Sequence, residues 1–67
     1  MSEWISVKDR LPYIGEIVLI CVVGTYDTYV GVSFGENKFV TILNMQLLEN
    51  KITHWMPLPN PPEENNE

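Results

Sequence analysis

The chain has 67 residues, of which 45% are hydrophobic, and nine acidic residues against four basic ones give a net charge of −5. This length corresponds to one domain with a small hydrophobic core, since a chain of this size buries only about 60% of its unfolded surface. A single cysteine excludes an internal disulfide, and one cysteine with one histidine is too few for a four-ligand zinc site within one chain.

The basic residues are too few and too dispersed for nucleic-acid binding. Phosphate neutralisation needs clustered Lys or Arg side chains, whereas those present are spread along the sequence: Lys8, Arg10, Lys38 and Lys51. Residues 1–62 are expected to form one small β domain, followed by an acidic, disordered tail at 63–67. No segment is long and apolar enough for a membrane, and the N-terminus lacks the features of a signal peptide, so we expect a cytoplasmic protein.

The first half of the chain is predicted to form short strands joined by tight turns. Residues 4–7 are β-prone, and Leu-Pro-Tyr-Ile-Gly at 11–15 indicates a turn. The strongest strand signal is at 17–23, where every residue is apolar and both faces of the strand are therefore apolar. Because a strand of an open antiparallel sheet normally has one polar face, this strand needs a cover on both sides. A curled sheet, the C-terminal segment at 52–62 or a second subunit would supply it.

The segments that follow show a clearer alternation of side chains between the two faces of a strand. A hairpin loop is expected at 24–27. In the strand that follows, the alternation assigns four residues to the core face: Thr28, Val30, Val32 and Phe34. Gly31 within this strand marks a bend or a close contact. A second turn at 35–37 leads to another strand at 38–43.

The last part of the chain contains a short helix-prone stretch and a final strand. Residues 44–50 fit a single helical turn or a wide loop equally well. In the final strand at 52–56, alternation places Ile52, His54 and Met56 on one face and Thr53 and Trp55 on the other. Pro57 and Pro59 have no backbone N–H to donate, so strand pairing should end at Met56 or continue on only one side of the strand. The prediction is a mainly β fold: a small curled antiparallel sheet of four or five short strands, open or barrel-like, with at most one short helical turn.

The sequence offers little that supports catalysis. Cys21 lies in the most apolar strand, where burial would make it a small hydrophobic residue rather than a nucleophile. No phosphate-binding loop, dinucleotide fingerprint or nucleophile motif is present. We therefore expect a protein that is not an enzyme, with no catalytic residues, no metal ligands and no cofactor.

Aromatic side chains and the histidine are the candidates for a binding surface: Trp4, Tyr26, Tyr29, His54 and Trp55. Aromatic rings anchor protein interfaces or stack on the base of a nucleotide. The structural alternative is that the two Trp side chains pack together and tie the chain ends, while His54 binds a backbone carbonyl near the final turn. The proline-rich segment at 57–62 fits a rigid closing arm better than a polyproline ligand.

The two ends of the chain together carry a recognisable pattern. It consists of Trp4-Ile5-Ser6-Val7, Arg10-Leu11-Pro12, Gly15, Val18, Thr53-His54-Trp55-Met56-Pro57-Leu58-Pro59 and Pro61-Pro62. On these residues, which extend over nearly the whole chain, the sequence resembles the family known as domain of unknown function 551, found in phages and prophages of enteric bacteria. The resemblance implies a phage or prophage setting, but it implies no activity and no functional residues.

These observations lead to an expected function and one alternative. We expect a non-catalytic small phage-type protein that binds a host protein in the host cytoplasm and modulates it, an anti-defence role being one form. The alternative is a small-ligand binder that stacks a nucleotide-like molecule on its aromatic rings in a dimer cleft. The two apolar faces of the strand at 17–23 also predict a homodimer.

Overall fold

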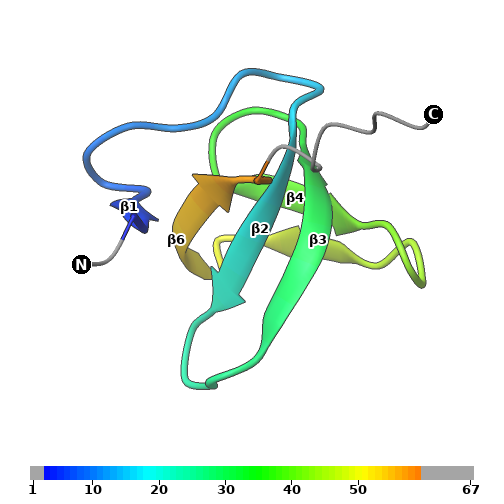
Figure 1. Ribbon diagram of the computed structural model, residues 1–67. Coiled ribbons are helices and arrows are strands. Elements are labelled where there is room, and N and C mark those ends of the chain that lie inside the picture. Colours follow the sequence, from blue (N-terminus) through cyan, green and yellow to red (C-terminus); the bar gives the residue numbers. More distant parts are fainter. Residues whose placement is uncertain (1–2, 60–67) are drawn as a thin grey trace, which may run out of the picture.

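The computed structural model describes residues 3–59 as one antiparallel sheet of six strands (Figure 1). The strands are β1 (Ile5–Ser6), β2 (Ile17–Val22), β3 (Thr28–Ser33), β4 (Lys38–Thr41), β5 (Leu47–Glu49) and β6 (Ile52–Pro57). Their order across the sheet is β1-β6-β2-β3-β4-β5, so the last strand lies between the first two. The predicted mainly β fold is confirmed, with six strands rather than four or five and without closure into a barrel.

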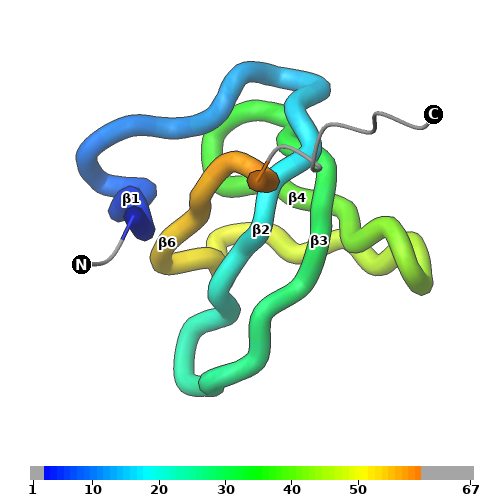
Figure 2. The backbone as a smooth tube through the Cα atoms, in the orientation of Figure 1, coloured from blue at the N-terminus to red at the C-terminus, as the bar shows by residue number. Residues whose placement is uncertain are grey.

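The sheet curls strongly, and its concave side holds the core. β4 is the neighbour of β3 in the sheet, yet it passes behind β2 and β3 (Figure 1). The backbone trace in Figure 2 shows the first and last strands, β1 and β6, side by side. The buried hydrophobic side chains share the concave face: Val18, Ile20, Phe39, Leu48, Ile52 and Trp55. The curl therefore covers one of the two apolar faces of β2.

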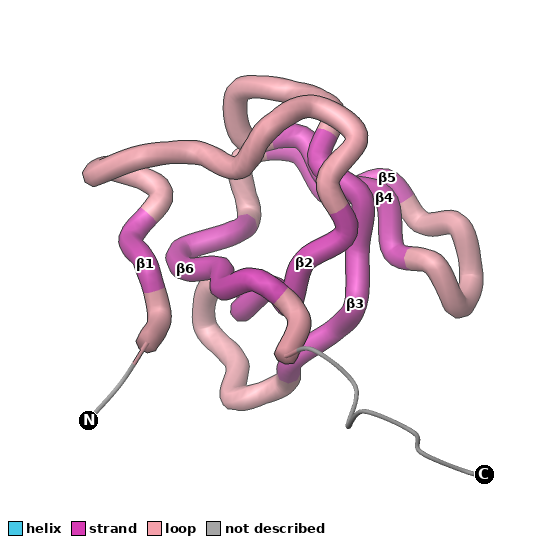
Figure 3. Tube along the Cα trace, turned by 45° about the horizontal axis from the view of Figure 1, so that its top comes forward, coloured by secondary structure: helices cyan, strands magenta, loops and turns pink. Residues whose placement is uncertain are grey.

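The long connection between β1 and β2 runs over one end of the sheet (Figure 3). It begins with Val7, whose backbone N–H donates to the Thr53 carbonyl at 3.0 Å. It ends at Gly15, whose N–H donates to the Ser33 carbonyl at 2.7 Å and whose φ of 89° is accessible to glycine at little cost. The turn predicted at 11–15 is thereby confirmed.

The two faces of β3 are the reverse of the prediction. Gly31 and Ser33 are buried on the concave side, whereas Val30 is 37% exposed and Phe34 57% exposed. The reason is steric, because a Cβ atom at Gly31 would lie 3.0 Å from the Cδ1 atom of Ile20. Thr28, Val30, Val32 and Phe34 therefore occupy the convex face, while the close contact predicted at Gly31 is confirmed.

A β-bulge also changes the predicted faces of β6. Cys21 is the register partner of His54, but the next residue of β2, Val22, is the partner of Ile52, so Thr53 is an extra residue. Ile52 and Trp55 are therefore both buried on the concave side, each 3% exposed. The expected grouping of Ile52 with His54 was wrong, because strict alternation assumes a strand without a bulge.

Residues 52–57 of the C-terminal segment lie within the sheet, beside β2 rather than over one of its faces. β6 pairs with β2 along its length, and the pairing extends to Pro57, opposite Val18. Residues 44–50 form a turn followed by β5 and contain no helix, because pairing with β4 overrides a weak helical propensity. The predicted tail at 63–67 and the prolines at 61–62 lie outside the described residues.

Candidate functional site

The structure does not bring the predicted binding residues together within one chain. Tyr26 lies fully exposed in the β2–β3 turn, and Tyr29 is 42% exposed on β3. His54 is exposed on β6, and its Nδ1 atom lies 3.1 Å from the hydroxyl of Thr53 rather than against a backbone carbonyl. A nucleotide-stacking cleft would need rings from two copies of the chain, and it stays a prediction.

Trp55 has a structural role. Its indole Nε1–H donates to the backbone carbonyl of Arg10 at 2.9 Å, and the Arg10 guanidinium lies 5.6 Å from the ring centroid. Trp4, the other predicted ring, is half-buried just before β1, and β1 pairs with β6 through Ile5 and Trp55. Pairing of β1 with β6 therefore joins the two ends of the chain.

A cavity of about 330 Å³ adjoins this Arg10–Trp55 contact. Its lining residues come from the β1–β2 connection and from β6: Arg10, Leu11, Pro12, Tyr13, Glu16, Trp55 and Pro57. This volume is at the lower end of small-molecule sites. Because Trp55 is only 3% exposed, its ring cannot stack on a base from this side.

The turn between β4 and β5 presents two highly exposed aliphatic side chains, Leu43 and Met45. Leu43 is 95% exposed, Met45 75% and Ile42 44%. A second cavity, of about 280 Å³, lies beside this turn. Its lining is formed by β3 and by the start of the turn: Thr28, Tyr29, Val30, Thr41, Ile42 and Leu43.

A buried hydroxyl holds the β4–β5 turn in one conformation. The Thr41 side chain, 3% exposed, donates to the amide oxygen of Asn44 and accepts from the Gln46 N–H at 3.0 Å. The Thr41 backbone N–H donates to the Gln46 carbonyl at 2.9 Å. Within the turn, Met45 has a φ of 56°, which is uncommon for a non-glycine residue and is retained only where neighbouring contacts enforce it.

The sequence did not predict this site, which we call the apolar turn (residues 42–46). The helix formers from Met45 onward obscured it. The available signal was the combination of two apolar residues, Leu43 and Met45, with Asn44 between them. Asn is frequent in turns, so Asn44 indicates a turn at this position. Apolar residues in a surface turn do not contribute to the core, which makes Leu43 and Met45 candidates for a binding surface.

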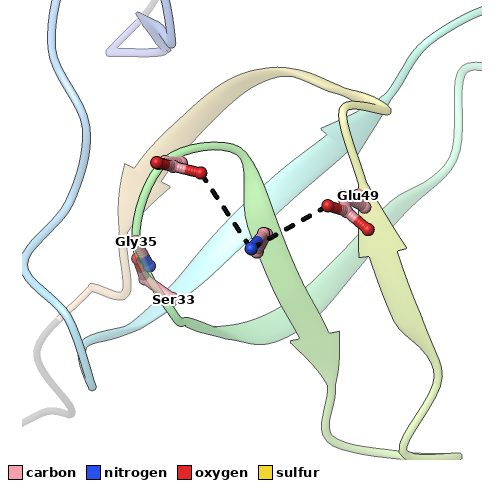
Figure 4. A network of polar contacts seen from close by, with 5 residues as sticks. Ser33, Gly35 and Glu49 are labelled. Carbon is pink, nitrogen blue, oxygen red and sulfur yellow. Dashed lines mark hydrogen bonds and ion pairs between the residues drawn. The ribbon is translucent and has the colours of Figure 1, made fainter.

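A charged cluster lies at the opposite end of β4 (Figure 4). The Lys38 Nζ atom is 4.0 Å from a carboxylate oxygen of Glu36 and 3.9 Å from one of Glu49. These side chains are well exposed, and such pairs contribute little to stability. The charged cluster and the apolar turn therefore lie at opposite ends of β4.

The only thiol of the described residues, Cys21, lies directly opposite His54 of β6 in the strand register. Partial burial raises the pKa of the Cys21 thiol and so disfavours the nucleophilic thiolate. Across residues 3–59, no three side chains of His, Cys, Asp or Glu lie close enough to hold a metal ion. The most distinctive feature is therefore an apolar surface.

Comparison with known proteins identifies the family. No membrane-crossing helix is found in residues 3–59, and no solved structure matches the chain. One relative, the "Uncharacterized 7.8 kDa protein in ral-gp17 intergenic region" of Salmonella phage P22, is 32% identical over 68 residues, which cover 92% of this chain and 98% of the relative. The family model "Protein of unknown function (DUF551)" matches residues 3–63. The chain belongs to this family, as the pattern at its two ends indicated.

Proposed function

We propose that this chain is a non-catalytic binding protein of a phage or prophage, which attaches to a host protein in the host cytoplasm and modulates it. The observation that supports this proposal is the apolar turn, where Leu43 and Met45 are 95% and 75% exposed on a backbone fixed by the buried Thr41 hydroxyl. The relative from Salmonella phage P22 supports a phage or prophage origin. An anti-defence role is one form that such modulation takes.

The geometry of the apolar turn suits a protein partner. Burying a Leu or Met side chain that is otherwise exposed contributes about 1.5–3 kcal/mol. A turn that is already ordered loses little conformational entropy on binding, so more of this contribution is retained. The adjacent cavity of about 280 Å³ is available for a side chain of the partner. We therefore expect the host protein to offer an apolar pocket for Leu43 and Met45.

Quantitative affinity capture from host lysate tests this function. The tagged chain is compared with Leu43→Asp, Met45→Asp and Tyr26→Asp, the last being an equally exposed site in a different turn. The proposal predicts a host protein that the unaltered chain and Tyr26→Asp retain, and whose recovery falls about tenfold with either substitution in the apolar turn, equivalent to a loss of about 1.4 kcal/mol. Equal recovery by all variants, or no host protein above background, contradicts it.

A further inference from the structure

The convex face of the sheet carries a second apolar surface, which meets the apolar turn at Val30. It consists of five side chains on β2, β3 and β6, which we call the outer patch: Ile17, Leu19, Val30, Val32 and Met56. The strand register makes the outer patch continuous, because Ile17 lies opposite Val32, and Leu19 lies between Val30 and Met56.

The outer patch is accessible, although the structure buries the other face of the same strands. Ile17 is 45% exposed and Val30 37%, and the remaining members are half-buried by their neighbours. β2 and β3 pass in front of β4, so the curl of the sheet protects only the concave side (Figure 1). Residues 60–67, which lie outside the described range, read Asn-Pro-Pro-Glu-Glu-Asn-Asn-Glu and contain no Leu, Ile, Val, Met or aromatic residue.

We infer that a second copy of this chain covers the outer patch in a two-fold symmetric dimer. A two-fold interface uses the same surface on both subunits, so that surface must be complementary to itself. An uncharged apolar sheet face meets this requirement, and two such faces pack together at about 10 Å in β-sandwiches.

The distribution of charge is compatible with contact between two outer patches. The chain has a net charge of −5, so two copies repel each other wherever acidic residues meet. β2, β3 and β6 contain no Asp, Glu, Lys or Arg, and His54 is their only ionisable residue besides Cys21 and Tyr29. Two copies can therefore meet across these strands without bringing acidic residues of the strands together.

The size of the outer patch sets the expected strength of the dimer. A standard interface buries about 800 Å² per subunit, or about 16% of the 5147 Å² that the chain exposes. The five side chains fall short of this area, and Phe34, which is 57% exposed at the margin of the patch, extends it. We therefore expect a reversible dimer with a Kd in the micromolar range, about 1–100 µM.

Sedimentation equilibrium over about 1–500 µM tests the dimer directly. The average mass should rise with concentration from 7.7 kDa toward twice that value, 15.4 kDa. Ile17→Lys and Val30→Lys should each weaken the dimer at least tenfold, because each places a buried charge at the symmetric contact. The control is Tyr26→Lys, which places the same charge at a fully exposed position in the β2–β3 turn and should dimerise as strongly as the original chain.

A dilution series followed by NMR gives a second readout that needs no variant. Amide shifts that depend on concentration should lie in β2, β3 and β6 and not at residues 43–46 of the apolar turn. A chain that stays at 7.7 kDa at the highest concentration overturns the inference, as does a dimer that folded Ile17→Lys and Val30→Lys do not weaken. A patch that binds only a host protein also overturns it. Loss of host-protein capture with Leu43→Asp tests the proposed function independently of subunit mass.

Discussion

The side-chain amide of Asn37 acts as a strand partner for Ile52. Its Nδ2 atom donates to the Ile52 carbonyl at 2.9 Å, and its Oδ1 atom accepts from the Ile52 N–H at 3.3 Å. Asn37 lies in the β3–β4 turn, whereas Ile52 begins β6, and β6 and β4 are not neighbours in the sheet. One side chain therefore bridges the curl at a place where the sheet does not close.

Replacing Asn37 by Ala should destabilise the fold by about 1–3 kcal/mol, because both backbone polar groups of Ile52 lose a part-buried partner. Urea unfolding followed by tryptophan fluorescence measures the change. Lys8→Ala, at an exposed position, serves as the control and should stay within about 0.5 kcal/mol of the original. An Asn37→Ala protein as stable as the control would show that the bridge contributes nothing.

Gly31→Ala should cost about 1–3 kcal/mol of stability through steric crowding. The added methyl group would lie 3.0 Å from the Cδ1 atom of Ile20 and 3.2 Å from the backbone oxygen of Val40, and the backbone oxygen cannot move away easily. Thr28→Ala, on the same strand but exposed, is the comparison. Thermal unfolding of the two variants should separate them, and equal melting temperatures would contradict the packing described for β3.

Thr41→Val should loosen the apolar turn and weaken capture of the host protein, although the contact residues Leu43 and Met45 are not themselves substituted. The substitution keeps the shape of the side chain but removes the hydroxyl that contacts Asn44 and Gln46. We expect a loss of about 1–2 kcal/mol in stability and a several-fold loss in capture. Thr41→Ser keeps the hydroxyl and should restore capture. Full capture by a folded Thr41→Val protein would show that pre-ordering of the turn is unimportant.

The thiol of Cys21 should react slowly with iodoacetamide at about pH 8 in the folded protein. Burial raises its pKa, so less thiolate is present in the folded state than in the unfolded state at this pH. The protonated Cys21 thiol therefore contributes fully to the stability of the fold when the pH is below the pKa of the thiol in the unfolded chain. This contribution is lost as the pH rises through the pKa of the thiol in the folded protein. Labelling should accelerate in denaturant, and Cys21→Ser should lack this part of the alkaline destabilisation. Equal labelling rates in the folded and unfolded states would contradict the assignment.

The antiparallel β architecture could be predicted because the strands between Ile17 and Met56 are separated by clear turn signals. The number of strands could not, since β1 has two residues and β5 has three. β5 also has helix-forming residues, and only its pairing with β4 makes it a strand. Tertiary pairing of this kind leaves no trace in local propensity.

The assignment of faces failed for two physical reasons. On β3, the rule that apolar residues lie inside selected the face of Val30 over the face of Gly31. The fold requires the reverse, because Ile20 occupies the space beside Gly31. On β6, the extra residue Thr53 shifts the alternation by one position. The apolar turn was missed because a surface role for Leu43 is visible only when its exposure is known.

The most direct test of the proposed binding role is hydrogen–deuterium exchange on the chain alone and in complex with the captured host protein. The apolar turn, residues 42–46, should gain protection in the complex, while the exposed turn at 23–27 that contains Tyr26 should exchange at an unchanged rate. Protection confined to 23–27, or to any surface that excludes 42–46, would contradict binding through Leu43 and Met45.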